Sequence, residues 1–293
     1  MKKILVITLT LLFCKFTFAQ EYPVQITDQG YIIVEVTLID SIKANFILDT
    51  GAGAVVLSAK TFEKIKNKAV TSGYFTGFRN DGDRIDGEIY KIPSLAIGDI
   101  VQKDVLIGIY PPLDDYGVEG LVSLKFFEDK PFNIDFKNKK ITFLSNDDIL
   151  KLKNNNTAVP ITLQIQSDFS LDIFIRICLG NDVNVNAEFD TGSGYNTFLV
   201  NPFFMNQLGL DKNKIQSGIF KTPITGTDLT EYKSVLNSVK VCNTNNFSTG
   251  NVSVDVPVIF REGLIYEALI GSFLFRNGNI TIDIPDKLVM YGE

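Results

Sequence analysis

The sequence Phe46-Ile47-Leu48-Asp49-Thr50-Gly51-Ala52-Gly53 has a counterpart 141 positions later, Ala187-Glu188-Phe189-Asp190-Thr191-Gly192-Ser193-Gly194. In both copies an extended run of apolar or alternating residues leads one Asp into a Thr-Gly turn, and a second β-rich run follows. One such tripeptide is most often an ordinary β-turn, because Asp and Gly are common turn formers. Two copies in matched surroundings predict an internal duplication that brings two carboxylates together.

The match between the two halves extends beyond the turns. The offset of 141 aligns residues 34–38 with residues 175–179, and an offset of 148 aligns residues 119–122 with residues 267–270. Similarity over this length predicts two copies of one β-rich unit. Few helical stretches separate the strand-like runs, so we expect a pair of all-β barrels rather than a parallel α/β sheet.

Local patterns in the first half predict a short helix and a hairpin. Residues 58–68 carry apolar residues among lysines and predict a short amphipathic helix. Residues 72–90 are rich in Gly, aromatic residues and Asp-Gly pairs, which predicts a hairpin with an exposed tip. The acids between Asp81 and Gly87 partly match a calcium loop. Ile85 occupies a ligand position and no acid falls at the twelfth, so we predict no calcium site there.

The first residues have the pattern of an export signal. Lys2-Lys3 precede an apolar run from Ile4 to Phe13, and Thr17-Phe18-Ala19 forms a small-residue cleavage site. The alternative is a buried first strand. We expect export to the periplasm or the extracellular space, and no later stretch has the length of a membrane helix.

The polar segment at residues 145–157 is poorly periodic and is the best linker candidate. The predicted division is therefore a signal peptide at 1–19, a first lobe at 20–146, a linker at 147–157 and a second lobe at 158–293. Loss of residues 1–19, which hold three lysines and no acid, changes the formal net charge from −6 to −9. An acidic chain without basic clusters predicts neither a nucleic-acid nor an anionic-membrane partner.

The sequence contains no histidine, which removes several kinds of active site. Ser-His-Asp and Cys-His catalysis, His-ligated zinc and an imidazole general base all need that residue. The two cysteines beyond the signal, Cys178 and Cys242, are too few for a cysteine zinc site. They fit either a disulfide or buried small hydrophobes. Carboxylates are the main remaining candidates for acid–base chemistry.

Two carboxylates held about 3 Å apart share one proton, because like charges in a shielded site repel each other. The ionised group activates a water between them, and the protonated group polarises a carbonyl and assists the leaving group. This chemistry needs no metal and no organic cofactor. Gly51 and Gly192 let backbone N–H groups approach the carboxylates. The short hydroxyl side chains of Thr50 and Thr191 are suited to hydrogen bonds across a two-fold interface.

The Asp-Thr-Gly-Ala and Asp-Thr-Gly-Ser turns, each after apolar residues, resemble those of aspartic proteases, pepsin-like and retropepsin-like. The resemblance is greatest to the bacterial retropepsin-like group, here in a tandem two-lobe form, whose members are secreted or membrane-associated. That family pairs each turn with a later apolar-apolar-Gly segment. Leu269-Ile270-Gly271 matches it, whereas Leu121-Val122-Ser123 places a serine where glycine is usual.

The resemblance implies an all-β acid-protease fold of two homologous, closed β-barrel-like lobes, with few short helices and an active-site cleft between the lobes. It implies that Asp49 and Asp190 are the catalytic pair, supported by Thr50, Gly51, Thr191 and Gly192. Hairpins at 74–90 and 220–232 would be flaps over the substrate, with Tyr74, Phe75, Gly77 and Gly226 as candidate flap residues. Because one chain supplies both halves, a monomer suffices for one site.

The leading hypothesis from sequence is an aspartic endopeptidase acting on peptides or proteins. A second hypothesis is a non-catalytic member of the same fold that binds extended peptides by strand addition. A third is an extracellular β-rich adhesion or assembly module, in which the two Asp carboxylates lie far apart. Ser123 is the residue at which the family pattern is weakest, on the side of the first lobe.

Overall fold

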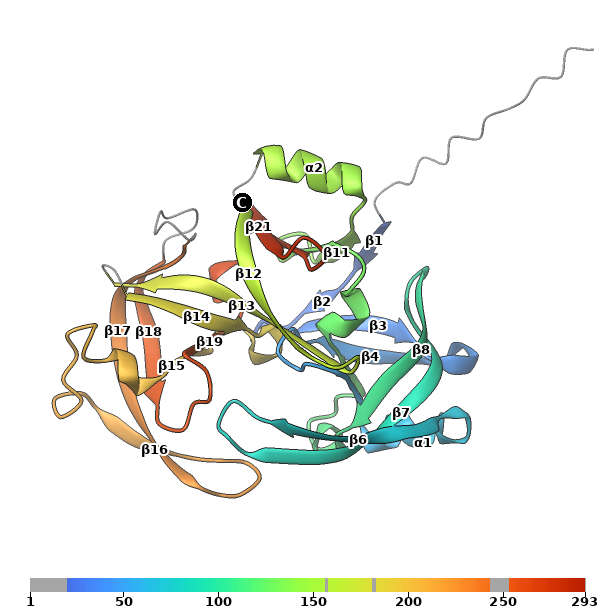
Figure 1. The fold of residues 1–293 in the computed structure, drawn as a ribbon, viewed down its shortest axis with the longest axis horizontal. Helices are drawn as coiled ribbons and strands as arrows, with labels where there is room; N and C mark the ends of the chain where they lie inside the picture. Colours follow the sequence, from blue (N-terminus) through green and yellow to red (C-terminus); the bar gives the residue numbers. More distant parts are fainter. Residues whose placement is uncertain (1–19, 156–157, 181–182, 243–252, 293) are drawn as a thin grey trace, which may run out of the picture.

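The computed structural model describes residues 20–155, 158–180, 183–242 and 253–292, and the predicted signal peptide lies outside them. Figure 1 shows two β-rich lobes joined by a central group of strands. No helix in the described part of the chain is long and apolar enough to cross a membrane.

The first lobe is a barrel built from one sheet. Its strand order in space is β2-β3-β4-β9-β5-β8-β7-β6, and the pair Thr37↔Ala96 closes the ring between β3 and β7. The strands are β2 (Gln25–Ile26), β3 (Ile32–Thr37), β4 (Lys43–Leu48), β5 (Val55–Leu57), β6 (Val70–Phe78), β7 (Arg84–Ile97), β8 (Ile100–Ile109) and β9 (Gly120–Val122).

The second lobe repeats this arrangement. Its order β13-β14-β19-β15-β18-β17 corresponds to β3-β4-β9-β5-β8-β7, and three residue pairs between β13 and β17 close the ring. The strands are β12 (Ala158–Gln166), β13 (Ser170–Leu179), β14 (Val183–Phe189), β15 (Phe198–Val200), β16 (Ser217–Lys221), β17 (Asp228–Val241), β18 (Ser253–Arg261) and β19 (Ala268–Ile270).

The central strands come from both halves of the sequence. They are β1 (Gln20–Pro23), β10 (Phe132–Asp135), β11 (Lys140–Phe143), β20 (Asn279–Asp283) and β21 (Leu288–Gly292). β10 pairs antiparallel with β20, and the Asn133 amide donates to Thr281 across that junction at 2.8 Å. The last strands of the two halves therefore lie side by side, which fixes the lobes relative to each other.

Helical segments are short. They are α1 (Ala59–Glu63), α2 (Asn146–Asn155), and the 3-10 turns η1 (Ile39–Ser41), η2 (Lys66–Lys68), η3 (Pro111–Asp114), η4 (Leu124–Phe127), η5 (Thr191–Ser193), η6 (Pro202–Phe204) and η7 (Ser272–Leu274). The Ser58 side chain caps α1 by accepting from the Thr61 N–H. α2 lies within the polar segment predicted as the linker.

Alternating residues give each lobe its core. On β13, Ile173, Ile175 and Ile177 are fully buried, whereas Phe174 and Arg176 between them are partly exposed. The same alternation on β14 turns Phe189 into the core and Glu188 to the opposite face. Asp190 follows on that opposite face, so the strand that builds the core also presents the acid.

The predicted fold class, all-β with two barrel-like lobes and few short helices, is confirmed. The exact division of the sequence into lobes and linker stays a prediction.

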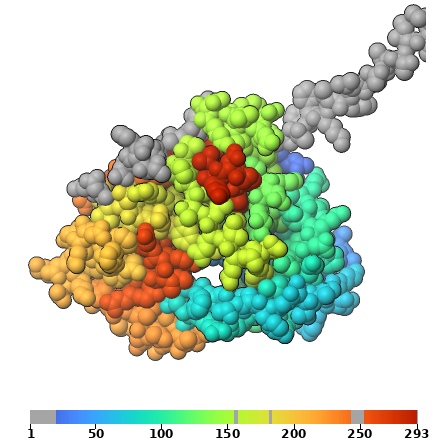
Figure 2. All heavy atoms as spheres, viewed as in Figure 1, coloured from blue at the N-terminus to red at the C-terminus, as the bar shows by residue number. Residues whose placement is uncertain are grey.

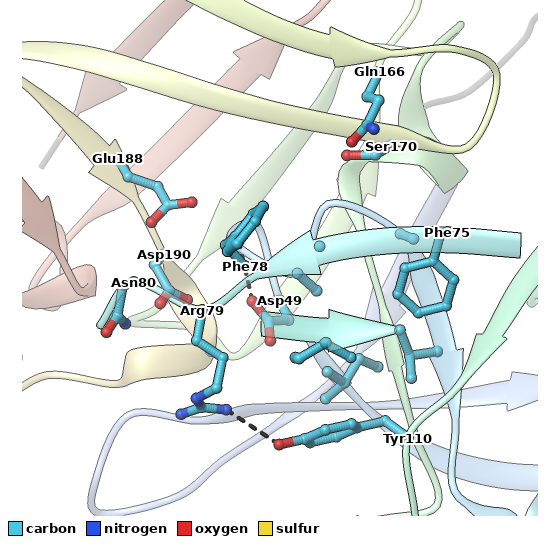
Figure 3. A pocket seen from close by; sticks show the side chains of 18 of the residues that line it. Asp49, Phe75, Phe78, Arg79, Asn80, Tyr110, Gln166, Ser170, Glu188 and Asp190 are labelled. Carbon is cyan, nitrogen blue, oxygen red and sulfur yellow. Dashed lines mark hydrogen bonds between the residues drawn. The ribbon is translucent and has the colours of Figure 1, made fainter. Parts of the chain in front are cut away.

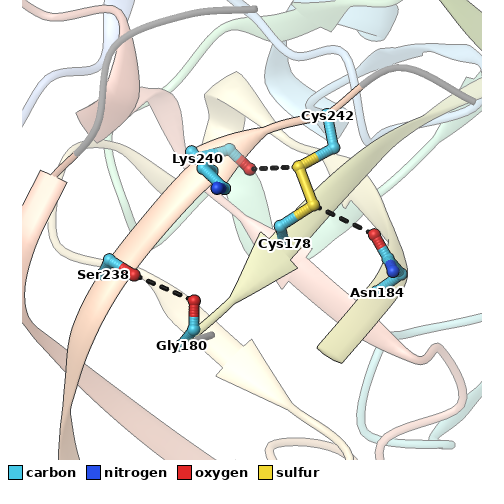
Figure 4. Close-up of a disulfide and its surroundings, with 6 residues drawn as sticks. All are labelled: Cys178, Gly180, Asn184, Ser238, Lys240 and Cys242. Atoms are coloured by element: carbon cyan, nitrogen blue, oxygen red, sulfur yellow. Dashed lines mark hydrogen bonds between the residues drawn. A yellow bond between two sulfur atoms is a disulfide. The ribbon is translucent and has the colours of Figure 1, made fainter. Parts of the chain in front are cut away.

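A disulfide joins Cys178 on β13 to Cys242 just after β17, with their Cα atoms 5.9 Å apart (Figure 4). The Cys242 N–H also donates to the Arg176 carbonyl at 3.0 Å. The bond therefore links the two strands that close the second barrel. The sequence left open whether these cysteines pair, and the structure shows that they do.

We expect loss of this disulfide to destabilise the second lobe. A closed loop with a sequence separation of 64 residues corresponds to about 4 kcal/mol of unfolding free energy in the chain-entropy model. The measurement is urea unfolding of the Cys178→Ser/Cys242→Ser variant, with the reduced wild type as its matched control. Equal unfolding midpoints for the oxidised wild type and the variant would contradict the expectation.

Candidate active site

The two Asp-Thr-Gly turns meet at the centre of the molecule and exchange hydrogen bonds. The Thr50 N–H donates to Thr191 Oγ1 at 3.1 Å, and the Thr191 N–H donates to Thr50 Oγ1 at 3.0 Å. Each hydroxyl then donates to a carbonyl of the other lobe, Thr191 to Leu48 at 2.7 Å and Thr50 to Phe189. Both threonines are fully buried, so these four bonds hold the turns in one relative position.

The two glycines of the turns are needed because the opposite carboxyl fills the space of a side chain. A Cβ on Gly51 would lie 2.7 Å from Asp190 Cγ, and a Cβ on Gly192 would overlap the Asp49 carboxyl. The Asp49 and Asp190 carboxyls are themselves within hydrogen-bonding reach of each other. The structure thus brings together all six residues that the sequence predicted for the dyad and its support. Figure 3 shows the two acids, Asp49 and Asp190, near each other.

The surroundings of the two acids differ. Asp190 accepts hydrogen bonds from the Ser193 N–H at 3.1 Å and from the Ser193 hydroxyl, whereas Asp49 accepts from the Gly51 N–H at 3.0 Å. Desolvation in the cleft raises the pKa of both groups, and the neighbouring Asp190 charge raises the pKa of Asp49 further, to well above its ordinary value. The extra donors favour the charged form of Asp190, so Asp49 is the group that keeps the shared proton.

Ser123 occupies the position at which the family pattern has glycine, and the structure accommodates it. At the matching Gly271, a Cβ would overlap the Gly194 carbonyl oxygen, which accepts from the Ser272 N–H at 2.9 Å. In the first lobe the Gly53 carbonyl instead accepts from the Leu171 N–H of the other lobe at 3.0 Å. That change leaves room for the buried Ser123 side chain, and the threonine exchange is intact.

The dyad lies at the base of a cavity of about 340 Å³ between the lobes. Its first-lobe wall is mainly apolar, with Val56, Phe75, Ile85, Ile109 and Leu121, and its second-lobe wall includes Ser170, Glu188 and Tyr266.

The β12–β13 hairpin of the second lobe reaches over the first and helps to enclose the cavity. Phe169 packs on Phe75 with ring centroids 5.1 Å apart. Figure 2 shows the yellow-green surface of this hairpin against the cyan surface of the first-lobe hairpin.

The predicted flap residues divide into two groups. Phe75 and Gly77 line the cavity. Tyr74 is 76% exposed and does not line this cavity, and Gly226 has open space around it at the tip of the β16–β17 hairpin. Flap function stays a prediction for all four residues.

The tips of the two long hairpins touch each other. Asp83, between β6 and β7, is 3% exposed and accepts from the N–H groups of Ile224 and Thr225 at 2.7 and 3.2 Å, and from the Thr225 hydroxyl at 2.5 Å. The Ile265 N–H donates to the Asn80 carbonyl at 3.1 Å. We call these contacts the hairpin clasp. Asp83, one of the acids that the sequence analysis considered only for calcium, therefore joins the lobes; Figure 1 shows the tips of the β6–β7 and β16–β17 hairpins near each other.

Sequence reasoning did not identify two further acids near the dyad, Asp172 and Glu188. Desolvation and the Asp190 charge raise the pKa of Asp172 to about 7 and hold the pKa of Glu188 well above its ordinary value. Glu188 stands two residues before Asp190 in an extended segment, and that spacing could have indicated it. In the part of the chain that the structure describes, no group of three or more His, Cys, Asp or Glu residues is arranged to hold a metal ion.

Residues 34–126 match the family model described as aspartyl protease. The chain contains an aspartyl protease domain. The predicted resemblance to aspartic proteases is thereby confirmed for the stretch that contains Asp49 and Ser123. A search of curated protein sequences found no match.

Solved structures similar to the whole chain include the basic 7S globulin from soybean, with a TM-score of 0.51 and 10% identity over 94% of both chains. Conglutin gamma, a basic 7S globulin from lupine seeds, has a TM-score of 0.51 and 12% identity over 94% of this chain and 95% of its own. At such identities the similarity shows a shared pepsin-like fold.

The matched positions 271 and 123 give a test of the turn geometry. We expect Gly271→Ala to lower the unfolding free energy by about 3 kcal/mol, because its methyl group overlaps the Gly194 carbonyl. Ser123→Ala, which loses the 3.3 Å bond from the Lys125 N–H, should cost about 1 kcal/mol. The measurement is chemical denaturation of both variants, and equal losses would contradict this account of Ser123.

Asp49→Asn should stabilise the aspartyl protease domain at neutral pH. Because the pKa of Asp49 is raised in the folded state, its carboxyl contributes to folding stability below the unfolded-state pKa. That contribution is lost as pH rises through the folded-state pKa. Asn does not ionise, so the variant should melt above the wild type at about pH 7 and gain less at about pH 4. Asp99→Asn, at an exposed position, is the control. A pH-independent difference in melting temperature would contradict the expectation.

Proposed function

We propose that this protein is an aspartic endopeptidase that hydrolyses peptide bonds with one water activated between Asp49 and Asp190. The observation that carries the proposal is the reciprocal packing of each carboxyl against the glycine of the opposite turn. This packing holds two acids in hydrogen-bonding reach in a desolvated cleft, as a shared-proton dyad requires.

In the proposed mechanism, ionised Asp190 takes a proton from the water as it attacks the scissile carbonyl. Protonated Asp49 donates a hydrogen bond to the carbonyl oxygen, and its proton stabilises the charge that develops there. Asp190 then returns its proton to the leaving amine. The cavity between the long hairpins is the place for the substrate, held as an extended strand.

The sequence left two alternatives to the enzyme, and the geometry of the two carboxyls argues against only one of them. The adhesion or assembly module expects the carboxyls far apart, and they lie in hydrogen-bonding reach. The non-catalytic peptide binder has the same geometry as the enzyme, so turnover alone separates the two.

We also propose that the chain is exported and acts in the periplasm or outside the cell. The signal pattern at residues 1–19 and the disulfide between Cys178 and Cys242 support this location, because disulfides persist in oxidising compartments.

The test is cleavage of a peptide library by residues 20–293 across acidic to weakly alkaline pH. Asp49→Asn and Asp190→Asn should each lower kcat/KM by about 1,000-fold or more, with circular dichroism unchanged. Asp99→Asn should keep wild-type turnover. The rate should fall at low pH as Asp190 becomes protonated, and at high pH as Asp49 ionises. The raised pKa of Asp49 places that upper limb above the usual carboxyl range.

Two results would overturn the proposal. One is wild-type turnover in either dyad variant. The other is binding of peptides or statine-like inhibitors with no cleavage at any pH, which would support the non-catalytic alternative.

A further inference from the structure

Glu188 is a buried acid in the cavity wall that the proposed mechanism does not use. It lies two residues before Asp190 on β14, so both side chains point to the cleft face of the strand. Glu188 is 2% exposed and lines the cavity, and Figure 3 shows it beside Asp190. The offset of 141 places Ile47 at the matching position of the first lobe, so the acid makes the two walls unlike.

The immediate surroundings of Glu188 are apolar. Its neighbours in register are Phe174 on β13 and Leu269 on β19, which point to the same face. Tyr266 packs edge-on against Phe174 with ring centroids 5.4 Å apart, and it also lines the cavity. The carboxyl is therefore bordered by two aromatic rings and one leucine.

The charged groups that face Glu188 are acids. Asp190, Asp172 and Asp49 all act on it electrostatically, and the Tyr266 hydroxyl hydrogen-bonds to it. Among the described residues, no Lys or Arg nitrogen lies within 4.0 Å of its carboxyl.

Two arginines in this region, Arg176 on β13 and Arg79 in the lining of the same cavity, have other neighbours. Arg176 pairs in register with Asn186, one step farther out on the sheet, and Arg79 pairs with Asp81 and donates to Tyr110. Glu188 is thus a cleft acid without a cation.

We propose that Glu188 forms a specificity subsite for a Lys or Arg side chain of the substrate, next to the scissile bond on the second-lobe side. This inference rests on the endopeptidase function proposed above. The aliphatic stem of the basic side chain packs on Tyr266, which lines the cavity beside Glu188. Its cationic head pairs with the Glu188 carboxylate, whose negative charge the neighbouring acids otherwise oppose.

The subsite couples substrate choice to pH. With the cleft empty, burial and the neighbouring acids favour the protonated form of Glu188. A bound ammonium or guanidinium favours the ionised form, so binding of a basic side chain releases a proton. Preference for Lys over an uncharged residue of similar length therefore grows as pH rises.

The experiment compares two peptides that differ only by Lys or norleucine at the residue beside the scissile bond. For the wild type we expect kcat/KM for the Lys peptide to exceed that for the norleucine peptide by about tenfold, a ratio that rises with pH. In Glu188→Gln and in Glu188→Ile, which copies the first lobe, the ratio should fall to about one and lose its pH dependence. Asp228→Asn, an exposed acid of the second lobe outside the cavity, should keep the wild-type ratio.

The outcomes separate this inference from the proposed function. Cleavage by the wild type with no preference for Lys, or a preference that persists in both Glu188 variants, overturns the subsite while the endopeptidase stands. Failure of the folded wild type to cleave any peptide overturns the endopeptidase and the subsite with it. If a Glu188 variant does not fold, the wild type alone still tests the subsite. Its ratio of kcat/KM for the Lys peptide to that for the norleucine peptide should rise with pH, and a ratio that does not change with pH would contradict the subsite.

Discussion

The mutual hydrogen bonding of Thr50 and Thr191 is the constraint on which the site depends. Each threonine satisfies a backbone N–H of the other turn and a carbonyl of the other lobe, with no water available in its place. Neither lobe can move alone without leaving buried polar groups unpaired, which is costly. The pairing of β10 with β20 among the central strands also holds the two lobes in one relative position. The two carboxyls are held in position because the backbone of the two turns is held in position.

Near-symmetry of the backbone is combined with asymmetry of the side chains. Ser193 supplies donors to Asp190, and its counterpart Ala52 supplies none to Asp49. Glu188 faces the cleft where the first lobe has Ile47. Two acids in identical environments would still share one proton, but neither would be preferred as its carrier. These substitutions give each acid a distinct environment without altering the strand order around it.

Much of the fold could be predicted from the sequence, because the two turns and the spacing around them encode both lobes. The dyad and the threonine contacts follow from the same signal, since a matched pair of turns implies a matched interface. Glu188 could have been found from strand alternation, because it shares a face with the predicted Asp190. Asp172 was missed because alternation shows which residues share a face, and the sequence alone does not show that the face of Asp172 lies near the dyad. The sequence did not decide whether Cys178 and Cys242 form a disulfide, because two cysteines 64 positions apart can either pair or pack as small hydrophobes. The pairing of β13 with β17 decides the question, since it places them side by side. Ser123 was judged by a family pattern, whereas its tolerance depends on the direction of one carbonyl, that of Gly53.

The hairpin clasp has a consequence for the shape of an acceptable substrate. Asp83 ties the first-lobe hairpin to Ile224 and Thr225 of the second, so the cavity is roofed by both lobes at once. A chain enters either by threading beneath this roof or by parting contacts that are buried from water. Compact folded proteins present no segment slender enough for the first route. Under the proposed endopeptidase function, the closed clasp therefore favours loose ends, linkers and unfolded chains over intact domains as substrates.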